Sequence, residues 1–135
     1  MKLNKELVLL RLFLMLLFGL FPQIYPTAIA EVDWNECLED LNAKWGTNCN
    51  NCMDSKDTYQ VSYKNVCLED IDVMICVQEK YLNWRCYTRF GLESQDTIFG
   101  YACKGSGRHL YWVKKAGNNQ ISFPTLEEVN EKYDD

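Results

Sequence analysis

All seven cysteines of this chain fall after residue 36, behind a segment with the features of an export signal. Basic residues precede an uninterrupted run of ten apolar residues, 12–21, and Ala28 and Ala30 occupy the two positions that a signal peptidase reads. We therefore expect residues 1–30 to be a signal peptide. A bilayer-spanning helix needs about 20 apolar residues, so we expect no membrane span once this segment is removed.

Export decides how the cysteines are interpreted. In an oxidising compartment, outside the cell or in a periplasm, cysteines are expected to form disulfides. The roughly 105 residues that remain form only a small core, which gains stability from covalent cross-links. Because seven is an odd number, at least one cysteine is left free or available to link two chains as a disulfide-bonded dimer.

The spacing of the cysteines favours one set of disulfides, although a second set competes with it. The favoured set is Cys76–Cys86, Cys67–Cys103, and Cys37 with either Cys49 or Cys52. If the apolar faces of both cysteine-bearing strands point into one core, Cys76 and Cys86 point apart unless a β-bulge shifts the register. The competing set is then Cys86–Cys103 and Cys49–Cys67, with Cys76 left over.

Residues 31–56 are interpreted as a cysteine-rich N-terminal helix and loop. Asp33 and Glu36 have the spacing of a capping box at the start of a helix over residues 32–45. Apolar side chains then recur at helical spacing at Trp34, Leu38, Leu41 and Trp45.

Residues 57–135 are interpreted as an antiparallel β domain. Apolar and polar residues alternate over five segments, 59–63, 71–77, 84–90, 97–103 and 109–115. The sequence also suggests a short sixth strand over residues 120–123. Thr125 and Glu128 begin a last short helix. The expected fold class is mainly β, a small disulfide-stabilised antiparallel sandwich or barrel with a short helix at each end.

Charge is unevenly distributed along the expected mature chain. Residues 31–135 hold 11 basic and 18 acidic side chains, a net charge of −7, which argues against nucleic-acid binding. Residues 80–115 are nevertheless basic and rich in aromatic side chains. This stretch either binds an acidic or sugar ligand or is neutralised within the fold. The candidate ligand-binding residues are Arg85, Tyr87, Arg89, Lys104 and Arg108.

Catalytic patterns are weak. Cys49 and Cys52 form a CxxC pair, but a polar loop follows where a redox site needs a helix. His109 is the only histidine and follows a glycine-containing turn, which is interpreted as a surface hairpin position. No nucleophile motif accompanies it. We expect no enzymatic activity, no cofactor and no metal site.

These observations favour a secreted, non-enzymatic interaction module that binds an extracellular protein or glycan. Two alternatives remain open. One is an envelope or extracellular structural component that is linked through the odd cysteine. The other is a small secreted hydrolase or redox protein, which would place His109 in a cleft or leave the CxxC pair exposed.

Overall fold

The computed structural model describes residues 31–134, so the expected signal peptide lies outside the described residues. A single 3₁₀ turn, η1 (Trp34–Cys37), is followed by six strands and one α-helix, α2 (Leu126–Lys132). The strands are β1 (Leu38–Trp45), β2 (Tyr59–Asn65), β3 (Ile71–Glu79), β4 (Trp84–Leu92), β5 (Thr97–Ala102) and β6 (Gly105–Lys115). No helix among the described residues is long and apolar enough to cross a membrane.

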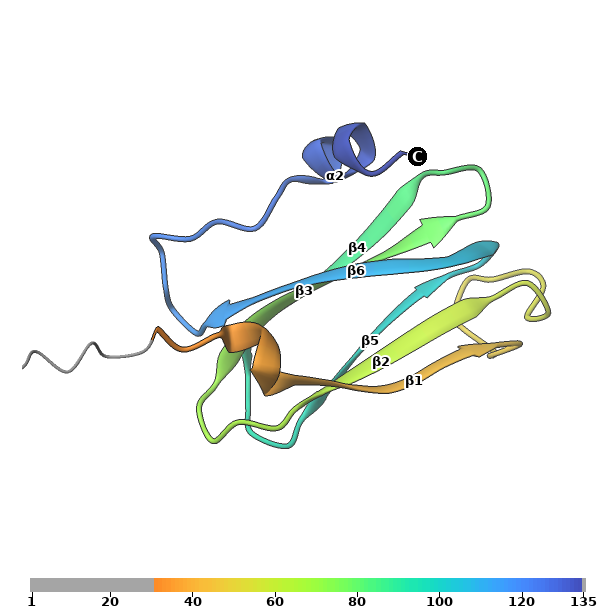
Figure 1. Ribbon diagram of the computed structural model, residues 1–135. Coiled ribbons are helices and arrows are strands. Elements are labelled where there is room, and N and C mark those ends of the chain that lie inside the picture. The colour runs from red at the N-terminus through yellow and green to blue at the C-terminus, as the bar shows by residue number, and fades with distance from the viewer. Residues whose placement is uncertain (1–30, 135) are drawn as a thin grey trace, which may run out of the picture. The chain divides into compact units, whose positions relative to one another are not determined.

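The strands form two antiparallel three-stranded sheets that face each other (Figure 1). The first sheet has the order β1-β2-β5, and the second has the order β4-β3-β6. The expected mainly β, antiparallel architecture is therefore confirmed. A closed barrel does not form, because each sheet ends in its own edge strands.

The main core lies between the two sheets. It is formed by alternate residues of the strands, including Val61 and Tyr63 of β2 and Val73 and Ile75 of β3. Each of these four side chains is at most 1% exposed. Complete burial of a side chain of this size contributes roughly 1.5–3 kcal/mol, so the alternation read from the sequence is what holds the sheets together.

A second apolar layer covers the outer face of the second sheet. Met74, Cys76 and Trp84 on this face pack with Val129 of α2. The helix lies on the side of this sheet that faces away from the first sheet (Figure 1). Strand β3 is consequently buried on both faces, which explains why Met74 and Cys76 interrupt a strict apolar–polar alternation.

The final helix forms as the sequence predicts. The short sixth strand suggested over residues 120–123 does not form. Thr125 and Glu128 complete a capping box, in which the Thr125 side chain accepts from the Glu128 backbone N–H. Residues 120–123 form no strand, and Phe123 packs against the outer apolar layer of the second sheet instead. The backbone carbonyls of Asn118, just before this segment, and of Ile121 within it accept hydrogen bonds from the buried Lys114 ammonium at 2.8 and 2.7 Å.

The prediction of an N-terminal helix over residues 32–45 is wrong. Only η1 is helical, with Asp33 as its N-cap, and residues from Leu38 onwards form strand β1. A β-bulge between Asp40 and Asn42 leaves Leu41 without a register partner on β2. The extra residue shifts the side-chain alternation by one, so a strand acquires apolar spacings that resemble those of a helix.

Three disulfides form: Cys37–Cys67, Cys52–Cys103 and Cys76–Cys86. The favoured Cys76–Cys86 bridge is confirmed. The favoured Cys67–Cys103 bridge is wrong, and Cys37 joins neither Cys49 nor Cys52. The competing set, Cys86–Cys103 with Cys49–Cys67, is also wrong, because Cys76 is paired. Among the described residues Cys49 is the cysteine that stays free.

Folding of β1 as a strand is the physical reason for the altered pairing. β1 lies antiparallel to β2 with Leu38 opposite Asn65, which brings Cys37 next to Cys67 at a Cα–Cα distance of 5.0 Å. The backbone N–H of Val66 also donates to the Cys37 carbonyl at 2.9 Å. Cys67 is therefore already occupied at one end of the sandwich, and Cys103 pairs with Cys52 of the loop after β1.

Candidate functional site

A groove lies between α2 and the second sheet and is named here the C-terminal groove. It measures about 630 Å³. Three aromatic side chains contribute to its lining, together with two carboxylates and three further residues: Trp112, Phe123, Tyr133, Glu128, Glu131, Ser122, Pro124 and Lys132.

The aromatic walls of the C-terminal groove come from both sides. Trp112 projects from β6 on the outer face of the second sheet, in the same row as Met74 of β3. Tyr133, just after α2, packs edge-on against Trp112 with ring centroids 6.1 Å apart. Phe123 contributes from the segment that precedes the helix.

Several contacts hold α2 in place over the sheet. Val129 is fully buried in the outer layer. The Asn130 side chain accepts the Trp84 backbone N–H at 3.0 Å, and the Tyr133 carbonyl accepts the Trp84 indole N–H at 3.3 Å. The C-terminal groove is thus lined in part by a docked helix and a sheet strand, which limits the ordering that ligand binding needs there.

A second groove, of about 490 Å³, adjoins the C-terminal groove. The two share Ser122, Phe123 and Pro124 as lining residues. The second groove extends over β4 and is lined there by Thr88 and Phe90, which is 68% exposed. The chain from Ser122 to Pro124 therefore lies between two neighbouring depressions on one sheet face.

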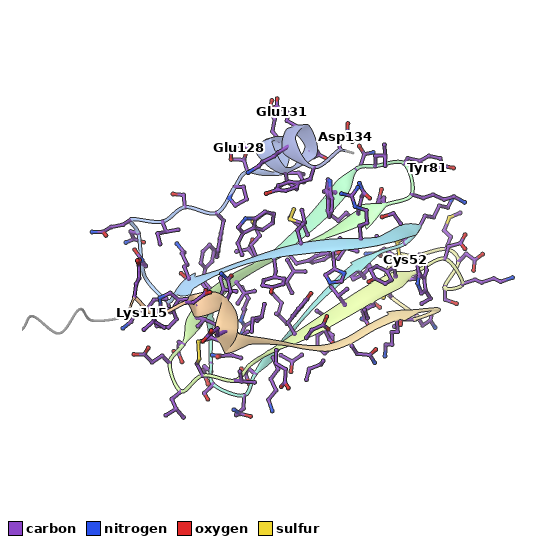
Figure 2. The ribbon with its side chains drawn as sticks, in the orientation of Figure 1. Cys52, Tyr81, Lys115, Glu128, Glu131 and Asp134 are labelled. Carbon is purple, nitrogen blue, oxygen red and sulfur yellow. A yellow bond between two sulfur atoms is a disulfide. The ribbon has the colours of Figure 1, made fainter. Side chains whose placement is uncertain are left out.

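Helix α2 supplies the charged side chains of the C-terminal groove, which are the carboxylates of Glu128 and Glu131 and the ammonium of Lys132. Figure 2 shows Glu128, Glu131 and Asp134 along and just after the helix. Glu128 also closes the capping box, since its carboxylate accepts the Thr125 backbone N–H at 2.7 Å. Glu131 is exposed and makes no ion pair within residues 31–134, so its carboxylate is available to accept hydrogen bonds from a ligand.

A third cavity of about 490 Å³ lies by the Cys52–Cys103 disulfide, at the end of the molecule that carries Cys52 and Tyr81 in Figure 2. Its lining includes Tyr81, Lys104 and the carboxylates of Asp54, Asp57 and Glu79. The described residues hold no cluster of side chains arranged to bind a metal ion here or elsewhere.

The structure brings only part of the predicted binding patch together. Arg85, Tyr87 and Arg89 lie on one face of edge strand β4, because they are register partners of Val77, Ile75 and Val73 of β3. The arginine nearest the β3–β4 turn, Arg85, is paired with Glu79 at 2.7 Å.

The Tyr87 side chain is occupied by a contact within the fold and is not free to bind a ligand. Its hydroxyl donates to the Tyr101 carbonyl at 2.6 Å, and the two rings lie 5.4 Å apart. Burial, and then the neighbouring Tyr101, raises the pKa of Tyr87. Tyr87 therefore joins β4 to β5 at the edge of the sandwich.

The other two predicted binding residues lie elsewhere. Lys104 is in the tight turn between β5 and β6 and lines the third cavity. Arg108 lies on the outer face of the second sheet, with its guanidinium 5.7 Å from the centroid of the Trp84 ring. The five residues are thus divided between two sheet faces and a turn.

His109 is not at a surface turn. Strand β6 begins at Gly105, four residues earlier, so His109 lies within the strand and opposite Val77 of β3. Its ring is partly buried, and its Nδ1 lies 3.1 Å from the Tyr59 hydroxyl. The sequence pattern predicted a turn over residues 104–108. In the structure, the two residues Cys103 and Lys104 form the turn that connects β5 and β6.

The CxxC pair is not a disulfide, because Cys52 is bonded to Cys103. Burial raises the pKa of the Cys49 thiol, although nearby Lys44 lowers it in part. A reactive thiol requires a lowered pKa, so the environment of Cys49 differs from that of a redox nucleophile.

The residues of the C-terminal groove were missed by sequence reasoning. Trp112 lies within the basic, aromatic-rich stretch 80–115, and Phe123 lies at the end of the short strand suggested over residues 120–123. The available signal was an alternation of apolar residues on both faces of β3, which requires a second covering layer. No protein-family model, no curated protein and no solved structure matches this chain.

Proposed function

We propose that this chain is an extracellular, non-enzymatic binding module that holds a glycan in the C-terminal groove. The observation that carries the proposal is the combination of Trp112, Phe123 and Tyr133 with the carboxylates of Glu128 and Glu131 around one groove of about 630 Å³. Ligand sites are typically concave and largely apolar, with a few polar groups that fix orientation.

The chemistry of the lining fits a sugar. An aromatic ring offers a flat apolar surface that packs against the C–H face of a pyranose ring, and tryptophan and tyrosine carry large contact areas. Ionised carboxylates only accept hydrogen bonds, and sugar hydroxyls can donate to them. The neighbouring groove over Thr88 and Phe90 would extend the contact for a chain of more than one sugar.

The compartment supports the proposal. Three disulfides are consistent with an extracellular or periplasmic protein, where glycans of surfaces and secretions are accessible. From the sequence, the basic stretch over residues 80–115 either binds an acidic or sugar ligand or is neutralised within the fold. The proposed site lies on α2 and the outer sheet face rather than on Arg85, Tyr87 and Arg89.

A glycan array probed with the labelled secreted protein tests the proposal, followed by calorimetric titration with the strongest glycan. Glu131→Gln removes a lining carboxylate and should weaken binding about tenfold, since a hydrogen bond to a charged group contributes about 1.5–3 kcal/mol. Glu127→Gln, on the same helix but outside the lining, is the matched control with the same charge change.

Aromatic variants provide a second arm. Trp112→Leu should abolish detectable binding, whereas Phe99→Leu, which changes an exposed aromatic on the first sheet, should leave it unchanged. Thermal unfolding establishes that each variant is folded. Absence of binding to any glycan, or binding that Trp112→Leu and Glu131→Gln leave intact, would overturn the proposal.

A second candidate function is a disulfide-linked structural component. The observation that favours it is Cys49, which stays unpaired and partly buried while the other six cysteines are bonded. Migration on a non-reducing gel distinguishes the two candidates: a dimer that is lost in Cys49→Ser supports the structural role, and a monomer excludes a link through Cys49.

A further inference from the structure

The charge around the C-terminal groove is predominantly negative. Residues 126–134, which form α2 and the two residues after it, hold four acidic side chains and one basic side chain, a net charge of −3. Two of the four carboxylates, those of Glu128 and Glu131, line the groove. These residues are three positions apart on the helix and are therefore neighbours on its surface. The groove thus has two adjacent anionic groups on its helical side.

The basic side chains of this sheet face offset little of that charge. Lys114 is buried and is paired with Asp72 at 3.8 Å. Arg108 lies outside the described lining of the groove. Lys132 does line the groove, and its ammonium lies 5.3 Å from the centroid of the neighbouring Tyr133 ring. The described lining therefore holds two carboxylates and one ammonium, a net charge of −1.

The aromatic and the charged parts of the groove differ in exposure. Trp112, Phe123 and Tyr133 are half-buried, whereas Glu128 and Glu131 are exposed. The aromatic rings thus form the inner surface of the groove, and the carboxylates lie at its rim. A ligand that complements both parts has a flat apolar face and a positive charge at its edge.

Both rim carboxylates can accept further hydrogen bonds. Glu131 forms no ion pair within the described part of the chain. Glu128 uses one oxygen, Oε2, to accept the Thr125 backbone N–H at 2.7 Å. A carboxylate has two oxygens and about four lone-pair positions, so the cap leaves Glu128 with acceptor capacity.

We propose that the glycan bound in the C-terminal groove is an amino sugar with free amines, such as an oligomer of glucosamine; this inference rests on the proposed glycan-binding function. In a β-linked glucosamine chair, the amine and the hydroxyls are equatorial and leave the two ring faces to C–H groups. One face would pack on Trp112, and the ammonium at the ring edge would donate to Glu131 or Glu128. Hydrogen bonds between ionised groups are roughly twice as strong as neutral ones.

Charge distinguishes this ligand class from other glycans. Residues 31–135 carry 11 basic and 18 acidic side chains, a net of −7, so the whole chain repels sugars that carry carboxylate or sulfate groups. Neutral sugars can pack on the same rings but bring no charge for the rim. Aromatic rings also attract cations through their faces, which adds to the preference for an ammonium group.

Calorimetric titration of the secreted protein with three tetramers tests the proposal. The first is the β-1,4-linked tetramer of glucosamine. The second is cellotetraose, in which a hydroxyl replaces each ammonium. The third is capped tetralysine, which has four ammonium groups and no sugar ring. At about pH 6, where glutamate is ionised, the glucosamine tetramer should bind about tenfold more tightly than either control.

Three variants of α2 test whether the rim charges cause this preference. Glu131→Gln should lower the preference for the glucosamine tetramer over cellotetraose from about tenfold to about threefold, as expected for an exposed ion pair. Lys132→Gln removes the ammonium from the lining and should raise the preference about threefold. Glu127→Gln makes the same charge change as Glu131→Gln outside the lining and should leave the preference within about twofold. Thermal unfolding verifies that each variant is folded.

Nuclear magnetic resonance locates the binding. The indole N–H signal of Trp112, assigned by its loss in Trp112→Leu, should shift in a saturable manner with the glucosamine tetramer. The indole signal of Trp45, on β1 of the first sheet, should not shift and serves as the internal reference. Raising the salt concentration from about 50 to about 500 mM should reduce the preference over cellotetraose, because exposed charges are screened.

The outcomes separate this inference from the proposed function. Cellotetraose that shifts Trp112 and binds as tightly as the glucosamine tetramer would overturn the amino-sugar assignment and leave glycan binding intact. Tetralysine that binds as tightly would show that the groove selects a basic peptide, which also contradicts the assignment. Equal effects of Glu131→Gln and Glu127→Gln would remove the rim carboxylates from the explanation. No shift of Trp112 with the glucosamine tetramer refutes the inference, and only a glycan array without any binding refutes the proposed function as well.

Discussion

Cys76 of β3 and Cys86 of β4 are direct register partners, with Cα atoms 4.0 Å apart, and both point to the sheet face that α2 covers. Neither side chain faces the core between the sheets. A neighbouring antiparallel pair can carry a disulfide without any bulge when both residues occupy the same face. The sequence suggested that Cys76 and Cys86 point apart if the apolar faces of both strands enter one core. The second apolar layer removes this conflict, because both cysteines face it.

The three disulfides should differ in how much they stabilise the fold. In the loop-entropy account, a longer closed loop restricts the unfolded chain more. Replacing Cys52 and Cys103 by alanine, a separation of 51 residues, should cost about 4 kcal/mol. Replacing Cys76 and Cys86, a separation of 10, should cost about 3 kcal/mol. Urea unfolding under oxidising conditions measures both. A larger loss for the Cys76–Cys86 pair would show that native packing outweighs the loop entropy.

Removing His109 should destabilise the protein measurably. His109→Ala deletes the hydrogen bond to the Tyr59 hydroxyl and the ring contacts with Tyr59 and Tyr63. The expected loss is about 1 kcal/mol, as for a partly buried hydrogen bond, or a fall in Tm of about 4–8 °C for a domain of this size. Lys104→Ala, in an exposed turn, is the control. An unchanged Tm in His109→Ala would contradict the contact with Tyr59.

The cover formed by α2 should depend on one buried side chain and one cap. Val129→Ala removes apolar surface from the outer layer and should cost about 2 kcal/mol or more. Thr125→Ala removes the N-cap and should cost about 1 kcal/mol. Calorimetry gives both values. Glu127→Ala, exposed in the first turn, serves as the reference, and equal stability of Val129→Ala and this reference would show that α2 is not docked.

The free cysteine should react slowly in the folded protein. Burial raises the pKa of the Cys49 thiol and outweighs the opposing effect of Lys44, so less thiolate is present at a given pH than in an unstructured peptide. Alkylation by iodoacetamide at pH 7.5, followed by mass spectrometry, should be slower than for glutathione and should accelerate in guanidinium chloride. A folded-state rate above that of glutathione would indicate an activated thiol.

Local patterns in the sequence determined most of the strands and the last helix. Alternation over Tyr59–Tyr63 and Ile71–Val77 is a property of the extended backbone itself, because successive side chains point to opposite faces. The capping box of Thr125 and Glu128 is likewise local, since it satisfies backbone donors within one turn. Five of the six strands and α2 were therefore predictable without knowledge of the rest of the fold.

Only the tertiary structure decided which faces meet. Leu41 follows helical spacing in the sequence, but pairing of β1 with β2 makes it the extra residue of a bulge. Local propensity is weak, so the hydrogen bonds and burial of a strand added to a sheet override it.

The cysteine pairs and the proposed site form only when tertiary folding brings distant segments of the chain together. Cys37 meets Cys67 across 30 residues, and Trp112 meets Tyr133 only after α2 folds back over the second sheet. The spacing of residues along the chain records which face of a strand a side chain occupies. It does not record which other face covers it, because that is settled by the burial of all apolar surfaces together.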